Sequence, residues 1–363
     1  MAARLKALIS GNDLLLSLIV AMVVVIVGVL LGWHSNRIFP ANPISTLHYT
    51  AEPGNHLSLL SDWDGPAYLN IVGSGYLIYP RASLFPFYPI TIYLVHLVVP
   101  SALDSALLVS WLSFVVAIYF YIKIIKKLYG TKKTENVLQA VTFFVLFPTA
   151  IFFIASYTES LFAMLALGAI YFVLTRRIVW SALLLMLSTA THITGVFVLI
   201  LTALMLLEQK EKIYKVFLYA AVGSLGIFSY TYYLHLHFHD ALAFLHSQTQ
   251  LNGWTHQSFS NIITSGGFFN FFFIFLLLVS FVFWWRRRRS FAIYSILFLL
   301  IPLVGREYGG FNRYVLMAFP VQLMLYEYFQ KKKAALPYAV AATTIIWTLF
   351  LIQYAGGWTG TGR

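Results

Sequence analysis

Two carboxylates lie close together in the stretch SDWDGPAYLNIVGSGY, residues 61–76. Asp62 and Asp64 follow the first long apolar run, in a chain of which only 10% is charged. A positioned carboxylate can take a proton from a reacting hydroxyl, and a neighbouring acid can be an alternative base or a metal ligand. Asp64 is followed by Gly65 and Pro66, so it is also suited to cap a helix N-terminus. The stretch predicts an acid–base site or a helix start.

The composition places these acids in a membrane protein. The 363 residues are 60% hydrophobic, mean hydropathy is +0.80, and apolar runs recur from residue 13 almost to the end. The first run, residues 13–32, has no small-residue cleavage site after it, so we expect a retained helix and not a signal peptide. The absence of cysteine excludes disulfides and thiolate chemistry. We therefore expect one polytopic, all-α domain over residues 1–363.

Basic residues predict the topology. Most of the 24 Lys and Arg fall in six clusters, at Arg4/Lys6, Lys123–Lys133, Arg176/Arg177, Lys210–Lys215, Arg286–Arg289 and Lys331–Lys333. If each cluster is cytoplasmic, an even number of crossings separates consecutive clusters. The predicted crossings are 13–32, 104–126, 136–155, 159–175, 178–191, 194–208, 213–235, 263–285, 290–304, 314–330 and 335–355. The clusters are sufficiently explained by orientation and by contact with anionic lipid, so a nucleic-acid partner is not expected.

One apolar run does not fit as a crossing. Residues 85–99 form a run of about 15 residues with two early prolines, short for a bilayer core of about 30 Å. We interpret it as an interfacial or re-entrant helix in a first outer loop of residues 33–103. The result is 11 crossings, with a cytoplasmic N-terminus, an outer C-terminus and a further outer loop at residues 236–262.

Titratable groups gather on the predicted outer face. All ten histidines and seven of the acids fall in outer loops or at outer helix ends in this topology. Such gathering indicates a functional site. A transporter would instead place ionisable groups near the midplane of broken helices, often within an inverted repeat, and no such repeat is found.

Several stretches resemble one family, the PIG-V-like mannosyltransferases, which are similar to the GPI mannosyltransferase II of eukaryotes. They are WDGPAYLNIVGSGY, LFPFYP, LFPTAIFFIASYTESLFAMLALGAIYFVLTRR, HDALAFLHSQTQLNGW and FNRYVLMAFP, and they occur in the family's order over residues 61–320. The resemblance implies a GT-C glycosyltransferase with juxtamembrane helices in its first outer loop. It also implies mannose transfer from a polyprenyl- or dolichyl-phosphate donor, with inversion, at the outer or lumenal face.

The resemblance suggests roles for individual residues. Asp64 of the W-D pair is the predicted base, with Asp62 as the alternative. Arg313 and Arg306 are predicted to bind the donor phosphate, and His192 to supply a proton or a hydrogen bond. The predicted substrate-binding residues are Trp63, Tyr68, Glu159, Asp240, Gln250 and Trp254. Structural alternatives stay open: an interfacial aromatic belt for Trp63 and Tyr68, a helix-dipole partner for Glu159, an outer-face anchor for Arg313 and a buried histidine for His192.

The chain departs from the family pattern at three places. His192 in THITG and Asp62 before W-D each stand where the family often has Arg, and NGWTHQ replaces a common Trp-Gly-Arg. No cofactor is required by the sequence. A divalent metal is the lesser alternative, held by His235, His239 and His246, which would share one helical face beside Asp240.

The predicted partners are the lipid-linked sugar donor, a lipid or glycan acceptor, and membrane lipids; the sequence leaves open whether a small membrane subunit takes part. The predicted location is the plasma membrane, or the endoplasmic reticulum membrane in a eukaryote. Two alternatives from other classes remain, a flippase or transporter of lipid-linked sugars and a non-catalytic membrane scaffold.

Overall fold

The structure is a computed structural model that describes residues 12–38, 56–131, 133–251, 267–304 and 310–355. Within these ranges the chain forms α-helices and short 3-10 helices and no strand. Among the described residues, four helices are long and apolar enough to cross a membrane, and shorter apolar helices accompany them. The chain is therefore a polytopic all-α membrane protein, as its composition predicts.

The elements follow one another along the chain with these bounds. They are α2 (Asp13–Ile38), η1 (Ser58–Leu60), α3 (Gly65–Ser74), η2 (Tyr79–Ser83), α4 (Phe87–His96), α5 (Ala102–Tyr129), α6 (Thr134–Val145), η3 (Ala150–Phe153), α7 (Glu159–Leu174), α8 (Ile178–Thr191), α9 (Gly195–Glu208), α10 (Ile213–Phe238), α11 (Ala243–Leu251), α13 (Gly267–Trp285), α14 (Arg289–Leu297), α15 (Leu300–Val304), α16 (Phe311–Val315), α17 (Phe319–Lys331) and α18 (Leu336–Ala355).

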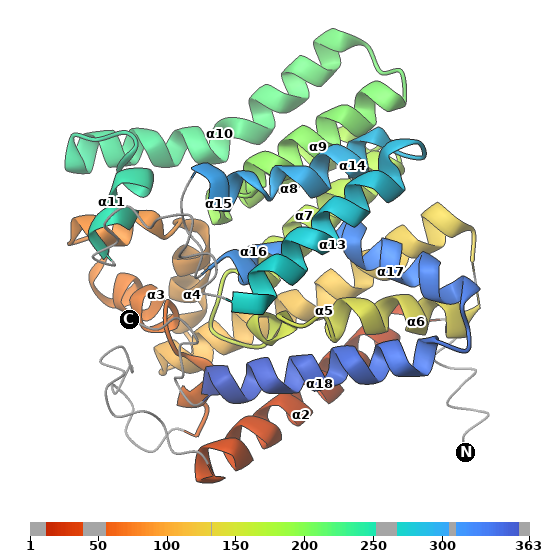
Figure 1. Ribbon diagram of the computed structural model, residues 1–363. Helices are drawn as coiled ribbons and strands as arrows, with labels where there is room; N and C mark the ends of the chain where they lie inside the picture. The colour runs from red at the N-terminus through yellow and green to blue at the C-terminus, as the bar shows by residue number, and fades with distance from the viewer. Residues whose placement is uncertain (1–11, 39–55, 132, 252–266, 305–309, 356–363) are drawn as a thin grey trace.

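The long helices run side by side in one bundle (Figure 1). Helix α5 packs against α7, α7 against α8, and α8 against α10, while α2 is covered by α5 and α18. The α8–α10 contact depends on small residues, because a Cβ added at Gly226 would collide with the backbone of Met186. Outward-facing side chains remain apolar: Leu14, Phe217 and Val282 are 55%, 77% and 72% exposed. Such a surface suits a lipid environment.

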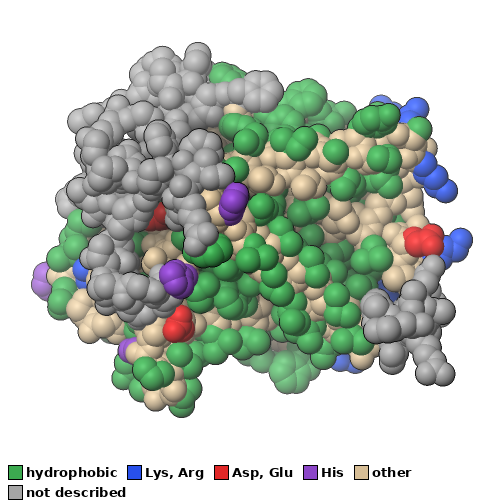
Figure 2. Space-filling view, turned by 90° about the horizontal axis from the view of Figure 1, so that it is seen from below, with side chains coloured by type: hydrophobic (Ala, Val, Ile, Leu, Met, Phe, Trp, Pro, Cys, Tyr) green, Lys and Arg blue, Asp and Glu red, His purple; other side chains and the backbone are tan. Residues whose placement is uncertain are grey.

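The two ends of the bundle differ in charge. The connections α5–α6, α9–α10, α13–α14 and α17–α18, which carry four of the basic clusters, all lie at one end, and α3, α4 and α11 lie at the other (Figure 1). In the space-filling view most visible Lys and Arg gather toward one end and the histidines toward the other, with an apolar belt between (Figure 2). The expectation that these basic clusters share one side is confirmed for the described residues.

Most predicted apolar segments coincide with helices, but three are broken. In the predicted segment 136–155 the α-helix ends at Val145, because Pro148 lacks the amide hydrogen that a continuing α-helix needs, and the 3-10 helix η3 follows. The segment 290–304 divides into α14 and α15. The segment 314–330 divides into α16 and α17, with Pro320 in the first turn of α17. The count of 11 crossings stays a prediction.

The predicted first outer loop, residues 33–103, contains more helix in its described part than its apolar run alone indicates. Helix α4, residues Phe87–His96, is the short helix expected within 85–99. Helix α3 precedes it and begins directly after Asp64, the residue that could serve as an N-cap. The Asp64 side chain makes no capping hydrogen bond there, so its carboxylate is available to another partner.

Candidate active site

The W-D loop, residues 61–64, joins η1 to α3 and has an unusual backbone. Trp63 adopts a left-handed conformation, with φ of 56°. A bulky residue there stores about 1–3 kcal/mol of strain, which the surrounding structure must overcome. Gly65 closes the turn by donating its N–H to the carbonyl of Asp62 over 3.1 Å. Asp62 and Asp64 therefore lie on either side of a tight turn.

Two buried tyrosines hold this backbone. The hydroxyl of Tyr157 accepts from the N–H of Asp64 over 2.8 Å and donates to the carbonyl of Asp62 over 2.9 Å. The hydroxyl of Tyr354 accepts from the N–H of Asp62 over 3.1 Å and donates to the carbonyl of Leu60 over 3.2 Å. Because buried backbone groups need partners, these hydroxyls fix the position of the loop.

The segment directly before α7 also supports the W-D loop. The N–H of Ser156 donates to the carbonyl of Leu60 over 2.9 Å, and the hydroxyls of Ser156 and Ser61 are 2.8 Å apart. A Cβ added at Gly65 would lie 2.6 Å from Ser156 Oγ, so only glycine fits between these serines without a shift.

The two aspartates differ in exposure. Asp62 is 1% exposed as a residue, while the Asp64 side chain is 40% exposed. A molecule outside the protein can therefore reach the Asp64 carboxylate, whereas Asp62 lies inside the protein.

Arg313 of α16 bridges Asp64 to a second carboxylate. Its Nη1 is 2.5 Å from Asp64 Oδ2, and its Nε is 2.9 Å from Glu159 Oε1 at the start of α7. The second contact is an ion pair by distance but lacks hydrogen-bond alignment. The Glu159 side chain is 3% exposed and that of Arg313 is 14% exposed. The three groups therefore form a chain of charges that runs from the interior to an accessible carboxylate.

Aromatic rings enclose the guanidinium. Its carbon lies 5.9 Å from the ring centre of Phe152, 5.3 Å from Tyr157 and 5.2 Å from Tyr314. The ring of His192 lies edge-on to Tyr314, with 5.2 Å between centres. These cation–π contacts restrict the movement of the guanidinium.

His192 lies beside the rings that enclose Arg313 but does not contact Asp64 in the structure. It lies in the turn between α8 and α9, where its Nδ1 is 2.8 Å from the hydroxyl of Thr194. Burial, and then the charge of Arg313, lower the pKa of His192 to about 3. The imidazole is therefore neutral at physiological pH and adds no positive charge.

Trp63 and Tyr68 pack inward. Trp63 lies 5.1 Å from Tyr354 and 5.9 Å from Phe152, between ring centres. Tyr68 is 4% exposed and meets Tyr88 edge-on at 5.1 Å. Both rings pack beside the W-D loop; Tyr68 is buried, and Trp63 is partly buried.

Asp240 lies in a separate cluster. Its Oδ2 accepts from the Tyr79 hydroxyl over 2.5 Å and meets His246 Nδ1 at 2.8 Å, and its Oδ1 accepts from the N–H of Leu242 over 3.0 Å. The hydrogen bonds from Tyr79 and His246 lower the pKa of Asp240. The cluster joins α11 to η2, and no contact with Asp64 is seen among the described residues.

The helical face predicted for the metal alternative does not form. Helix α10 ends at Phe238, and His239 turns into a left-handed conformation with φ of 55°. His235, His239 and His246 therefore do not continue on one helix. Within the described parts of the chain no group of three metal-ligating side chains comes together.

The sequence patterns did not identify every residue of the site, and some predicted site residues lie outside the described residues. Tyr157 belongs to the quoted SYTES stretch, so that motif was a usable signal, but nothing in the sequence singles out Tyr354. Arg306 and Trp254 lie outside the described residues, as does the side chain of Gln250.

The family follows from comparison with known proteins. Residues 18–284 match the family model described as Mannosyltransferase (PIG-V). The chain belongs to this family. It is therefore a membrane mannosyltransferase, with a sugar donor and an acceptor as substrates. The match includes the W-D loop, Glu159 and Asp240 and ends before Arg313 and Tyr354. No curated protein matches the chain.

Proposed function

We propose that this mannosyltransferase takes mannose from a polyprenyl- or dolichyl-phosphate carrier and transfers it to an acceptor hydroxyl at the outer or lumenal face of the membrane. The observation that carries the proposal is the chain of charges Asp64–Arg313–Glu159. It combines one accessible carboxylate with one enclosed guanidinium, which are the two groups that such a reaction needs.

Asp64 is the proposed base. Its carboxylate is exposed, and its backbone is held by Tyr157, so it can meet an acceptor hydroxyl in a fixed position. Asp62 is the weaker alternative because it is 1% exposed. Asp62 instead supports the loop through its backbone bonds to both tyrosines.

Arg313 is the proposed cation for the departing phosphate. A planar guanidinium suits bidentate contact with phosphate oxygens, and it keeps its charge at every physiological pH. In the structure its Nη1 is paired with Asp64. A bound donor phosphate would replace Asp64 as the partner of Nη1, and the Asp64 carboxylate would then be free to meet the acceptor. Glu159 would remain paired with Nε. Glu159 is therefore a positioning residue in this proposal.

The proposed step balances without a further reagent. The acceptor oxygen bonds to the anomeric carbon of mannose, and the bond from that carbon to the phosphate oxygen breaks. The proton of the acceptor hydroxyl goes to Asp64, and the bonding electron pair leaves with the phosphate, whose negative charge faces Arg313. Attack on the side opposite the leaving group inverts the anomeric configuration, from beta to alpha. No step requires a metal ion.

The distribution of basic residues between the two ends of the bundle supports the proposed membrane face. The W-D loop belongs with α3 and α4, at the end of the bundle opposite four basic connections (Figure 1). Basic connections are typical of the cytoplasmic side, so this arrangement supports a site on the outer or lumenal side.

The test uses the purified full-length protein in proteoliposomes with radiolabelled polyprenyl-phosphate mannose and a crude membrane-lipid acceptor pool. Label attached to acceptor and label moved across the bilayer are measured separately. We expect attachment by wild type, loss of attachment by Asp64→Asn, and retained attachment by Asp62→Asn if it folds. General-base removal predicts a loss of about 100- to 10,000-fold.

Two results would overturn the proposal. Equal attachment by wild type and the Asp64 variant would show that Asp64 is not the base. Transbilayer movement of the carrier without attachment would instead support a flippase. Donor binding by the Asp64 variant, measured with the same labelled carrier, serves as the control for a folded site.

A further inference from the structure

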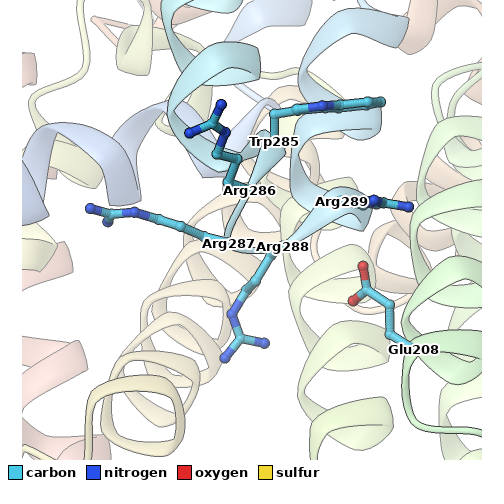
Figure 3. Close-up of a pocket in the computed structure, with 6 residues that line it drawn as sticks. All are labelled: Glu208, Trp285, Arg286, Arg287, Arg288 and Arg289. Atoms are coloured by element: carbon cyan, nitrogen blue, oxygen red, sulfur yellow. The ribbon is translucent and has the colours of Figure 1, made fainter.

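A second charged site lies at the far end of the bundle from Asp64. The stretch WRRRR, residues 285–289, runs from the end of α13 to the start of α14 and faces Glu208 at the end of α9. These six residues line an open groove of about 810 Å³. Figure 3 shows the four arginine side chains spread around the turn, with Glu208 approaching from the neighbouring helix.

The groove carries a surplus of positive charge. Arg287 is paired with Glu327, Nη1 to Oε2, at 2.6 Å. Glu208 lies in the groove, but its two oxygens accept from the N–H and the hydroxyl of Ser290, each over 2.8 Å, at the start of α14. Among the described residues Arg286, Arg288 and Arg289 form no ion pair. Three guanidiniums thus remain for an anion from outside the protein.

Aromatic contacts restrict three of these side chains. The Arg287 guanidinium lies 4.2 Å from the ring centre of Phe283, Arg288 lies 5.6 Å from Phe291, and Arg289 lies 5.8 Å from Trp285. Cation–π contacts limit the conformations of a long side chain, so less conformational freedom is lost when an anion binds. The groove is therefore partly organised before its ligand arrives.

The position of the groove indicates what kind of anion reaches it. It begins where the apolar helix α13 ends, and Trp285 at that end is 45% exposed. Exposed tryptophan and arginine at the end of an apolar helix are typical of the headgroup level of a bilayer. At that depth the abundant anion is the phosphate of a membrane lipid.

We infer that the groove lined by Arg286, Arg288, Arg289, Trp285 and Glu208 is a binding site for the phosphate headgroup of an anionic phospholipid. Guanidiniums contact the phosphate oxygens, the Trp285 ring lies beside the glycerol region, and the acyl chains extend along α13. The bound headgroup would join α13 and α14 to α9 by neutralising the charge between them. This site is independent of the proposed mannose transfer.

The test measures lipid binding by the full-length protein in a mild, uncharged detergent. Phosphatidylglycerol and phosphatidylcholine are titrated separately, and bound lipid is counted by native mass spectrometry alongside the unfolding temperature. The variant Arg286→Gln/Arg288→Gln/Arg289→Gln is compared with Lys331→Gln/Lys332→Gln/Lys333→Gln. The two triple changes remove equal charge, and the three lysines are exposed, Lys331 at the end of α17 and the other two directly after it.

We expect wild type and the lysine variant to retain phosphatidylglycerol over phosphatidylcholine, and the arginine variant to bind it at least about tenfold more weakly. Equal losses in both variants would show general surface attraction and overturn the site. Equal stabilisation by inorganic phosphate, without lipid, would assign the groove to a soluble anion and overturn the lipid assignment.

A second variant covers a failure of the first to fold. Arg286→Lys/Arg288→Lys/Arg289→Lys keeps the charge but lacks planar guanidiniums. We expect it to fold and to bind phosphatidylglycerol several-fold more weakly than wild type. Wild-type binding by this variant would overturn the guanidinium site.

Discussion

Tyr354→Phe tests whether the last described helix positions the W-D loop. The change removes one oxygen from α18 and leaves the ring, which packs on Trp63 and Tyr157. It deletes the hydrogen bond from the N–H of Asp62 at 3.1 Å and the one to the carbonyl of Leu60 at 3.2 Å. Tyr354 is 1% exposed, so little water is expected to replace the hydroxyl.

The size of the effect of Tyr354→Phe follows from the backbone groups that lose their hydrogen-bond partner. The N–H of Asp62 becomes a buried donor without its partner, which costs about 1–3 kcal/mol. The carbonyl of Asp62 keeps its bond from Tyr157, so the loop loosens on one side and does not detach. A displacement of the base as small as about 1 Å can lower a rate by about 100-fold. We therefore expect a lower unfolding temperature and a larger relative loss in kcat for mannose transfer than in donor binding.

The assay compares Tyr354→Phe with Tyr338→Phe on the same helix. Tyr338 is 77% exposed, so its hydroxyl lies outside the protein core. Thermal unfolding in detergent and transfer in proteoliposomes are measured for both variants and for Tyr157→Phe. If Tyr354→Phe matched the Tyr338 variant in unfolding temperature and in kcat, the claim that α18 positions the loop would be refuted.

Three further changes test neighbouring parts of the site. Gly65→Ala places a Cβ 2.6 Å from Ser156 Oγ, so we expect about 1–3 kcal/mol lower stability and slower transfer, partly restored by adding Ser156→Ala. Glu159→Gln removes the buried partner of the Arg313 Nε, so kcat/KM for the donor should fall about tenfold, about 1.4 kcal/mol; a change confined to the acceptor KM would contradict this role. Because the pKa of His192 is lowered to about 3, His192→Asn should leave the shape of the pH–rate profile unchanged between roughly pH 5 and 8; a lost inflection near pH 6 would contradict a neutral imidazole.

Much of the helical framework could be predicted from sequence because apolar runs are local. The segment 178–191 coincides with α8 at both ends, and 335–355 differs from α18 by one residue. The broken segments were predicted less well. Continuous hydrophobicity at residues 314–330 conceals the break before α17, which depends on backbone geometry around Pro320.

The sequence by itself determined the class of molecule, the family and the presence of acids in the W-D loop. These depend on composition, on the order of short motifs and on basic clusters, all of which can be read along the chain. Only the tertiary structure decided which acid is exposed and what it contacts. Arg313 meets Asp64 from 249 residues away, and Tyr354 meets Asp62 from 292 residues away. Such pairings are set by how separate helices pack, and a hydropathy pattern carries no information about them.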